Sequence, residues 1–353
     1  MTERKVTKTL KVRIRDKHAK ALRDQAASVN FVWNYVNELS SRSIRERGTF
    51  LSAYDIQKYT GGAAKDLGLH SHTVQEVGRE YATRRKQFRK ARLAWRKSRG
   101  VRRSLGWVPF KSGAAKWKSG QVFFNGQHFQ VWDSFGLSQY NFRSGCFNED
   151  ARGRWYFNVV VEVDVQPSSG KGAVGIDLGL KDVATCSDGV KLENGRFYRD
   201  LEDKLAIAQR ARKKRRVRSI HAKISNRRKD ALHKFSRQMV DRHGEIYVGD
   251  VSSSKLARTR MAKSVMDAGW GQLKTMLEYK CDHAGIAFKE VGEAYTTQTC
   301  SACGALPPQR PKGIAGLGIR EWTCECGVTH DRDINAAKNI LAAGHGRPAE
   351  GIS

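Results

Sequence analysis

An acidic residue inside an apolar run is the feature that most constrains the fold of this chain. Residues 173–180 read AVGIDLGL, which predicts a buried strand with Asp177 in its middle. A carboxylate inside such a strand is costly unless it is paired or holds a metal. The alternative is an Asp that caps a turn beside Gly179, and we favour the first interpretation because two further acids follow.

These acids are Glu293 in EVGEAYTTQTC and Asp333 in HDRDINAAKNI. Three carboxylates are enough to hold a pair of Mg²⁺ ions. The sequence therefore predicts one active site built from Asp177, Glu293 and Asp333.

The net charge of +30 indicates the substrate. The chain has 353 residues, with 65 Lys and Arg against 35 Asp and Glu spread along its length. Such a field suits a long polyanion, so the predicted substrate is a phosphodiester. No apolar run reaches the length of a spanning helix, and the first residues show no secretory signal, so we expect no membrane partner.

Strands and helices alternate in the second half of the chain in the order typical of an RNase H-like domain. Strands are predicted at 173–180, 183–186, 246–251 and 286–291. A long basic helical stretch is predicted from about residue 200 to 243, a second helix from Trp270 to Cys281, and a short helix after Asp333. The tail over 343–353 is predicted to be disordered.

The first half reads as a small β-barrel interrupted by a helical insertion. Residues 6–14 alternate as a strand, and a helix is predicted to bury Leu22, Ala26, Val29, Trp33 and Val36. Strands are predicted around the hairpin signal Asn125-Gly126 and over 155–163. A linker at 167–172 precedes the second half.

A basic run predicts nucleic-acid binding. A helix is predicted from Thr73, as N-cap, to Lys97, with Val74, Val77, Tyr81 and Phe88 as its apolar stripe. Its far end is nearly free of acids and interleaves Phe88 and Trp95 with cations, which favours phosphate-backbone binding over a merely solvated face. The predicted nucleic-acid-binding residues are Arg84, Arg85, Arg89, Arg92 and Arg96, and, equally open to a packing role, Arg227, Arg228 and Lys234.

A cysteine cluster predicts a second metal site, for zinc. Cys300 and Cys303 form a Cys-x-x-Cys pair. After twenty intervening residues, Cys324 and Cys326 form a pair one residue shorter than usual. His330 is a possible substitute ligand, although a surface position is the preferred interpretation. Free thiols are the alternative for the cluster.

Five segments together resemble the TnpB family of transposon-encoded, RNA-guided DNA endonucleases, which are related to type V CRISPR effectors. They are GIDLGLKDVAT, SNRRKDALHKFS, AGWGQLKTMLEYK, YTTQTCSACG and HDRDINAAKNIL, with a weaker match of TKTLKVRIR and NFVWNYVNEL. The resemblance implies an α+β and α/β multidomain fold with a wedge-like barrel at 1–15 and 106–168. It also implies a helical recognition insertion at 16–105 and a RuvC-like nuclease domain at 172–353, with a zinc ribbon at about 296–330.

The chain departs from the family at the second carboxylate. The family's usual Glu lies near the end of the central strand, where this chain reads Val248-Gly249-Asp250. Glu293, on the neighbouring strand about 5 Å away, could reach the same metals. The alternatives, in decreasing order, are Asp250 and an inactive nuclease, whereas strand alternation places Glu290 on the opposite face. The resemblance assigns the third ligand to Asp333, which leaves Asp331 as a neighbour or a helix cap.

The favoured function is an RNA-guided DNA endonuclease that cleaves beside a short adjacent motif with two Mg²⁺ ions and carries Zn²⁺. Its partners would be a guide RNA from the transposon end and double-stranded target DNA, in a prokaryotic cytoplasm at the nucleoid. The alternatives are an RNA-guided repressor without nuclease activity, favoured by Gly249, and an unguided nuclease such as a junction resolvase. The large basic first half argues against the last.

Overall fold

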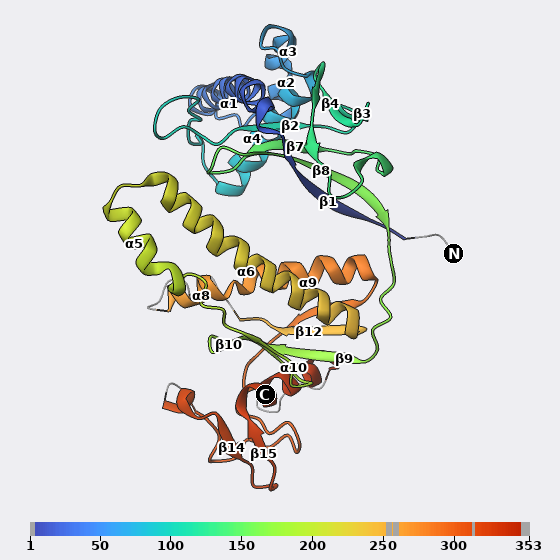
Figure 1. The fold of residues 1–353 in the computed structure, drawn as a ribbon, viewed down its shortest axis with the longest axis vertical. Coiled ribbons are helices and arrows are strands. Elements are labelled where there is room, and N and C mark those ends of the chain that lie inside the picture. Colours follow the sequence, from blue (N-terminus) through green and yellow to red (C-terminus); the bar gives the residue numbers. More distant parts are fainter. Residues whose placement is uncertain (1–3, 252–255, 257–260, 313–314, 347–353) are drawn as a thin grey trace. The chain divides into compact units, whose positions relative to one another are not determined.

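The computed structural model describes residues 4–251, 256, 261–312 and 315–346, and the chain divides into two compact units (Figure 1). The first unit comprises Thr7–Val163. The second comprises Met1–Val6 together with Asp164–Ser353.

Two sheets form the β-structure of the first unit. The five-stranded sheet has the order β2-β7-β8-β1-β6 and the three-stranded sheet the order β3-β4-β5. The alternation predicted over 6–14 is confirmed, because Val6, Leu10, Val12 and Ile14 are buried. Asn125 and Gly126 both have positive φ, as a tight hairpin between β4 and β5 requires. The strands are β1 (Lys5–Ile14), β2 (Trp107–Phe110), β3 (Ala115–Lys118), β4 (Gln121–Phe124), β5 (Gln127–Phe129), β6 (Val131–Trp132), β7 (Gly145–Glu149) and β8 (Trp155–Asp164).

One aromatic core joins these sheets to the helices of the unit. Phe110, Phe124, Phe147 and Phe157 are buried, and their ring centroids are 5.1–5.7 Å apart. Such offset and tilted ring pairs stabilise a core beyond their buried area. The helices are η1 (Asp16–His18), α1 (Ala19–Arg47), α2 (Ala53–Thr60), α3 (Ala63–Asp66), α4 (Ser71–Phe88) and η2 (Leu137–Gln139).

The predicted helix over 73–97 is wrong at both ends. His70, not Thr73, is the N-cap of α4, and the helix ends at Phe88 because Arg89 adopts the left-handed conformation with φ 51°. Val74, Val77 and Tyr81 are buried as predicted, whereas Phe88 is exposed. Residues 89–106 contain no helix.

A five-stranded sheet with the order β11-β10-β9-β12-β13 forms the centre of the second unit. Strand β9 pairs antiparallel with β10 and parallel with β12, which in turn pairs parallel with β13. The strands are β9 (Ala173–Asp177), β10 (Asp182–Cys186), β11 (Lys191–Glu193), β12 (Glu245–Gly249) and β13 (Ala287–Val291). Asp177 thus ends its strand rather than lying in its middle.

Helices cover both faces of this sheet (Figure 1). Ile176 and Val248 pack against α6 and α9, while Tyr247 and Val291 pack against Ile340 of α10 on the other face. The predicted basic helical stretch is divided into α5 (Glu202–Arg210) and α6 (Lys214–Arg242), where Arg212 has a φ of 52°. The other helices are η3 (Arg199–Leu201), α8 (Ala262–Ala268), α9 (Trp270–Ala284), η4 (Ala315–Gly318) and α10 (Arg332–Gly344).

The cysteine segment folds as a small module between β13 and α10. A two-stranded sheet of β14 (Glu321–Thr323) and β15 (Thr329–Asp331) leads directly into α10. Helix α10 extends to Gly344, so the predicted disorder is wrong for residues 343 and 344, and residues 347–353 lie outside the described part. Among the described residues, no helix combines the length and apolar character needed to cross a bilayer.

Gly175 allows α10 to lie directly on β9. An ideal Cβ at Gly175 would come within 2.1 Å of the carbonyl oxygen of Ala337 and 2.6 Å of the amide nitrogen of Leu341. Both are backbone atoms, so the helix itself would have to move. Close contact between α10 and β9 thus requires glycine at this position.

We expect Gly175→Ala to lower the free energy of unfolding of the second unit by about 1–3 kcal/mol, the usual effect of overpacking a core. Urea denaturation followed by circular dichroism measures the change. Gly292→Ala is the matched control, because an ideal Cβ there meets nothing within 4 Å. Equal stability of the two variants would contradict the close contact.

Candidate active site and metal centre

Asp177 and Asp333 are brought together by the contact between α10 and β9. Asp177 lies two residues after Gly175 and therefore on the same face of the strand. Asp333 lies one helical turn before Ala337, which covers Gly175. The two acids consequently lie near each other on the α10 face of the sheet.

Glu293 reaches the same face from the end of β13. Val248 of β12 lies opposite Ile176, so Gly249 is the β12 residue beside Asp177. An ideal Cβ at Gly249 would lie 3.0 Å from the Oε2 atom of Glu293. The Glu293 carboxylate therefore occupies the space into which a side chain at position 249 would extend.

The charges of these acids influence one another. Burial, and then the negative charges of Asp333 and Glu293, raise the pKa of Asp177 to about 7, and Arg332 partly opposes the shift. Burial also raises the pKa of Glu293, as does the nearby Asp250, while Lys274 lowers it. A site that raises the pKa of its carboxyl groups in this way favours the binding of a cation.

Three other acids near the candidate site occupy different environments. The Oδ1 atom of Asp250 accepts a 3.4 Å hydrogen bond from the Glu293 amide, so this exposed residue lies at the edge of the site. Glu290 instead pairs with Lys274 of α9 at 2.7 Å, on the face opposite α10, as strand alternation predicted. Asp331 is the N-cap of α10, where its Oδ1 atom accepts from the amides of Asp333 and Ile334 at 2.9 Å each.

Arg320 lies beside the candidate site and was not identified from the sequence. Its Nη1 atom lies 3.2 Å from the Oδ2 atom of Asp333. The residue precedes β14, and its carbonyl accepts a hydrogen bond from the Arg332 amide. Arg320 thus supplies a positive charge to the acids from the cysteine module.

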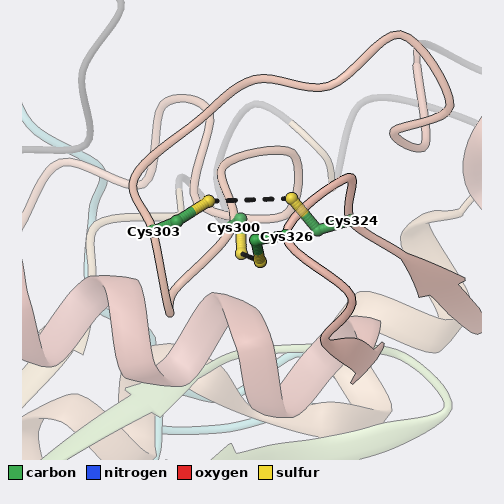
Figure 2. Close-up of side chains that lie close together, drawn as sticks. All are labelled: Cys300, Cys303, Cys324 and Cys326. Atoms are coloured by element: carbon green, nitrogen blue, oxygen red, sulfur yellow. Dashed lines mark hydrogen bonds between the residues drawn. The ribbon is translucent and has the colours of Figure 1, made fainter.

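The four predicted cysteines form a compact cluster (Figure 2). Their sulfur atoms all lie within 4.8 Å of one another, and the pairs Cys300–Cys326 and Cys303–Cys324 are each 3.7 Å apart. Tetrahedral zinc with Zn–S bonds of about 2.3 Å separates its sulfur ligands by about 3.8 Å. A hydrogen bond between the Ala305 backbone and the Cys303 thiol lowers the pKa of Cys303 to about 7, whereas burial raises the pKa of Cys300. The thiolate that a metal needs is therefore favoured at Cys303 but not at Cys300. This cluster could bind zinc.

The three acids are less tightly gathered than the cysteines. Among the described side chains, only the cysteines form a group of three or more His, Cys, Asp or Glu whose ligand atoms are all this close. The acids lie near enough to shift one another's pKa, yet Asp333 is directed to Arg320. Like charges repel, and a bound cation would draw them inward.

His330 is buried, so its predicted surface position is wrong. It is 6% exposed, its Nε2 atom lies 3.0 Å from the Cys300 sulfur, and its ring packs against Trp322. A ring nitrogen in this position can orient a metal-binding sulfur.

Two asparagines of α10 connect the acids to the cysteines. The Nδ2 atoms of Asn335 and Asn339 each donate to the carbonyls of Thr296 and Thr299, at 2.7–3.2 Å. The Oδ1 atom of Asn335 accepts from the Ser301 amide at 2.9 Å. The helix that carries Asp333 is therefore fastened to the segment that carries Cys300.

The predicted nucleic-acid-binding arginines divide into exposed and structural groups. Arg85 is 7% exposed, and its guanidinium donates to the Ser40 hydroxyl and the Leu51 carbonyl, so it is unavailable to a phosphate. Arg228 is mostly buried and donates to the Met266 carbonyl at 2.9 Å beside Asp267. The exposed members are Arg84, Arg89, Arg92, Arg227 and Lys234, while Arg96 is partly buried.

Comparison with known proteins gives two family matches. Residues 156–260 match a family model described as "Probable transposase", and residues 270–340 match one described as "Cas12f1-like, TNB domain". These matches confirm the resemblance to TnpB proteins that the sequence motifs indicated.

Two curated relatives carry names that agree with these family matches. A "Putative RNA-guided DNA endonuclease" of Streptomyces pristinaespiralis is 37% identical over 212 residues, 56% of this chain and 52% of that protein. The CRISPR-associated endodeoxyribonuclease Cas12f1 of Sulfoacidibacillus thermotolerans is 26% identical over 227 residues, with shares of 56% and 52%. The chain thus spans about half the length of the curated relatives it matches.

A solved structure shares the fold. A chain of the "Cryo-EM structure of the Cas12f1-sgRNA-target DNA complex" matches with a TM-score of 0.63 and 13% identity, covering 96% of this chain and 99% of that chain. The mixed α and β architecture expected from the sequence is confirmed at this level.

We expect the purified chain to contain one zinc ion, and Cys324→Ser to lose most of it, because three sulfur ligands bind zinc more weakly than four. Mass spectrometry of the metal content measures this. Cys146→Ser is the control, since Cys146 lies in the first unit, outside the cluster. Equal zinc content in both variants would contradict the assignment.

We expect Asp177→Asn to raise the Tm of the metal-free protein at pH 8. The folded-state pKa of Asp177 is raised to about 7, so its contribution to stability is complete below the unfolded value near 4 and is lost as the pH rises through 7. The neutral amide avoids this loss, and each 1 kcal/mol corresponds to about 2–4 °C in a unit of this size.

Thermal scans with EDTA at pH 5 and pH 8 measure the effect, which should be large only at pH 8. Asp203→Asn, at an exposed position on α5, is the control. No Tm gain at pH 8, or an equal gain at both pH values, would exclude a destabilising negative charge at Asp177.

Proposed function

We propose that this chain, a relative of TnpB proteins and of Cas12f1, is an RNA-guided DNA endonuclease. The observation that carries the proposal is the position of Glu293, whose carboxylate fills the space left by Gly249 beside Asp177. Glu293 replaces the missing carboxylate of the central strand, and Asp333 completes the set. Relatives named as such endonucleases support the activity.

The proposed cofactors are two Mg²⁺ ions at the acids and one Zn²⁺ at the cysteines. Carboxylate oxygens are the ligands that Mg²⁺ prefers, and thiolates suit zinc. Bound Mg²⁺ would activate the attacking water and stabilise the leaving 3′ oxygen. Asp177, Glu293 and Asp333 would hold the metal ions and so fix where the scissile phosphate lies. Arg320, which lies 3.2 Å from Asp333, would offer its positive charge to that phosphate.

The proposed domain assignment follows from the relationship to TnpB proteins and Cas12f1. Residues 172–353 would form the RuvC-like nuclease domain with its zinc ribbon at about 296–330. The strands of 1–15 and 106–168 would form the wedge-like barrel, and 16–105 the recognition insertion. The guide RNA, derived from the transposon end, would select double-stranded DNA by base pairing beside a short adjacent motif, so the protein itself need not read the target sequence.

We expect Glu293→Ala to reduce Mg²⁺-dependent cleavage of target DNA by more than about 100-fold, above the effect of losing a supporting contact. The reason is the loss of a direct metal ligand. Glu290→Ala, which alters the neighbouring acid on the opposite face, should retain activity. Asp250→Ala separates the two candidate metal ligands. If this variant loses cleavage while Glu293→Ala remains active, the second carboxylate is Asp250 and not Glu293.

The compensating double variant tests the position of the carboxylate directly. Gly249→Glu combined with Glu293→Gly returns the carboxylate to the central strand, and we expect it to cleave faster than Glu293→Gly alone. Electrophoresis of cleaved plasmid, with the purified guide complex, measures both. Equal cleavage rates for the double variant and Glu293→Gly would reject the proposal that Glu293 replaces the carboxylate of the central strand.

A repressor without nuclease activity is the second candidate, because Gly249 removes the usual ligand and the acids are not gathered as the cysteines are. It predicts target binding without cleavage in the wild-type protein. Sequencing the RNA that co-purifies with the chain tests both guided candidates, and the absence of a discrete RNA would favour an unguided nuclease.

A further inference from the structure

Residues 89–106, which we call the strap, are held along α1 by asparagine side chains. Asn34 accepts from the Arg96 amide and donates to the Arg96 carbonyl, both at 2.8 Å. Asn37 does the same with Leu93, at 3.0 and 2.8 Å. These side-chain amides provide the paired donor and acceptor that a neighbouring β-strand would offer.

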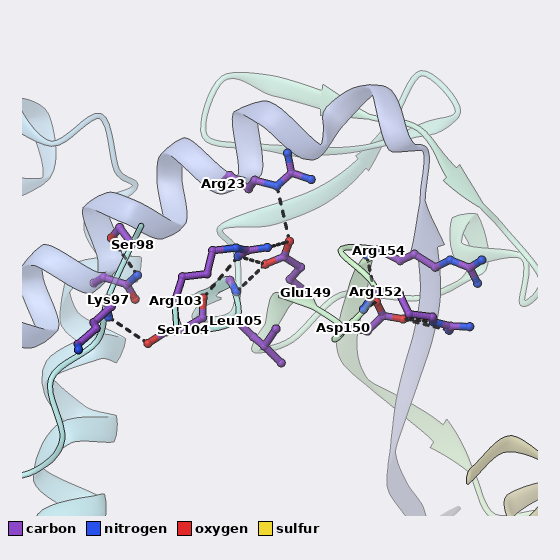
Figure 3. A network of polar contacts seen from close by, with 12 residues as sticks. Arg23, Lys97, Ser98, Arg103, Ser104, Leu105, Glu149, Asp150, Arg152 and Arg154 are labelled. Carbon is purple, nitrogen blue, oxygen red and sulfur yellow. Dashed lines mark hydrogen bonds and ion pairs between the residues drawn. The ribbon is translucent and has the colours of Figure 1, made fainter. Parts of the chain in front are cut away.

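Further contacts fix the strap on both sides of the hydrogen bonds made by Asn34 and Asn37. Asn30 accepts from the Arg96 Nε atom at 2.6 Å and donates to Ser98 at 3.1 Å, and the Trp33 indole donates to the Ala94 carbonyl at 3.2 Å. Arg103 makes a two-fold contact with the buried carboxylate of Glu149, at 2.6 and 2.7 Å (Figure 3). The strap is therefore a positioned element rather than a loose basic loop.

Two hollows adjoin the strap and the end of α4. The first has a volume of about 670 Å³, and its walls include Trp33, Trp107, Phe88 and Trp95. Phe88 is 56% exposed and Trp95 is 46% exposed, with the Arg92 guanidinium 5.2 Å above the Trp95 ring. The core holds Trp33 and most of Trp107, so Phe88 and Trp95 are the rings that a ligand can reach.

The second hollow has a volume of about 550 Å³ and repeats this combination. Phe50, which is 63% exposed, lies in its wall with Lys86, Arg89 and Lys90. Lys90 lines both hollows. The first hollow contains one acid, Glu80, against Arg84, Lys90, Arg92 and Arg96, and the second contains none.

We propose that the two hollows bind unpaired nucleotides of a single-stranded RNA, with bases stacked on Trp95 and Phe50 and a phosphate held by Lys90 between them. Exposed rings surrounded by cations suit single strands, because an unpaired base offers its face and the backbone offers its charge. In a duplex the base faces are covered, so its phosphates could reach the cations but leave the rings unused. Volumes of this size are typical of small-molecule sites.

The proposal rests on the proposed function, since the natural single strand would be an unpaired part of the guide RNA. It concerns binding alone, however, so it is tested without metal and without cleavage. If binding follows the proposal while Mg²⁺-dependent cleavage is absent, only the nuclease assignment fails. If cleavage occurs while the rings have no effect on binding, only this inference fails.

The experiment measures the affinity of the full chain, freed of nucleic acid, for a fluorescein-labelled ten-nucleotide oligo(A) RNA by anisotropy in EDTA. We expect Trp95→Ala to weaken binding about 5- to 150-fold, which corresponds to the 1–3 kcal/mol of one base–aromatic stack. Trp95→Phe should recover most of the affinity, and Phe50→Ala should weaken it similarly to Trp95→Ala. Phe31→Ala, at an exposed ring on α1 that lines neither hollow, is the matched control.

A ten-base-pair RNA duplex and a ten-residue oligoglutamate peptide are the competing probes. We expect Trp95→Ala to leave duplex binding within two-fold of wild type, because phosphate contacts remain. Unchanged oligo(A) affinity in Trp95→Ala, or an equal loss for the duplex, would overturn the proposal. So would oligoglutamate binding that depends on Trp95 more strongly than oligo(A) binding does. Circular dichroism of each variant checks that the helices are retained.

Discussion

The approach of α10 to β9 at Gly175 determines the geometry of the proposed active site. Because glycine offers no side chain, the helix backbone lies directly on the strand, and Asp333 comes to the same face as Asp177. Asn335 and Asn339 of the same helix fasten residues 296–301 by side-chain hydrogen bonds. One helix therefore positions an acid of the proposed nuclease site and the first cysteines of the proposed zinc site, so a disturbance of either should be felt at the other.

Much of the second unit could be predicted because its central strands are short apolar runs bounded by turn signals. Ile176 and Val248 face α6 and α9, whereas Tyr247 and Val291 face α10. Helices therefore bury both faces of the sheet, and strands of this kind read as apolar runs. Glu293 could be proposed as the second carboxylate because the resemblance to TnpB proteins marks Gly249 as a departure, and neighbouring strands lie about 5 Å apart. The positions of Arg320 and His330 could not be predicted, because they depend on how the cysteine module folds. No periodic pattern marks these residues.

The first unit shows where local sequence misled the prediction. Residues 89–97 are rich in Arg, Lys and Ala, which favour helices, yet they form the non-helical first part of the strap. Hydrogen bonds from the side chains of α1 outweigh the helix propensity of these residues, as tertiary contacts often do. A signal was present in α1 itself: Asn30, Asn34 and Asn37 recur at helical spacing beside its apolar stripe, and buried amides need partners. The same signal recurs in α10, where Asn335 and Asn339 bond the backbone of 296–299.

The net charge of +30 does not show which arginines a ligand can reach, whereas the positions of the individual side chains do. Arg85 and Arg92 belong to one basic run, but the first is buried against Ser40 and Leu51 whereas the second is exposed above Trp95. Removing the first would leave buried acceptors without partners and cost stability, whereas removing the second would change only the surface that a ligand meets. Loss of nucleic-acid binding in an arginine variant is therefore informative only where the side chain is exposed. Among the exposed arginines of the strap, Arg92 lies above Trp95 and Arg89 lines the hollow that contains Phe50, so these two adjoin the exposed rings.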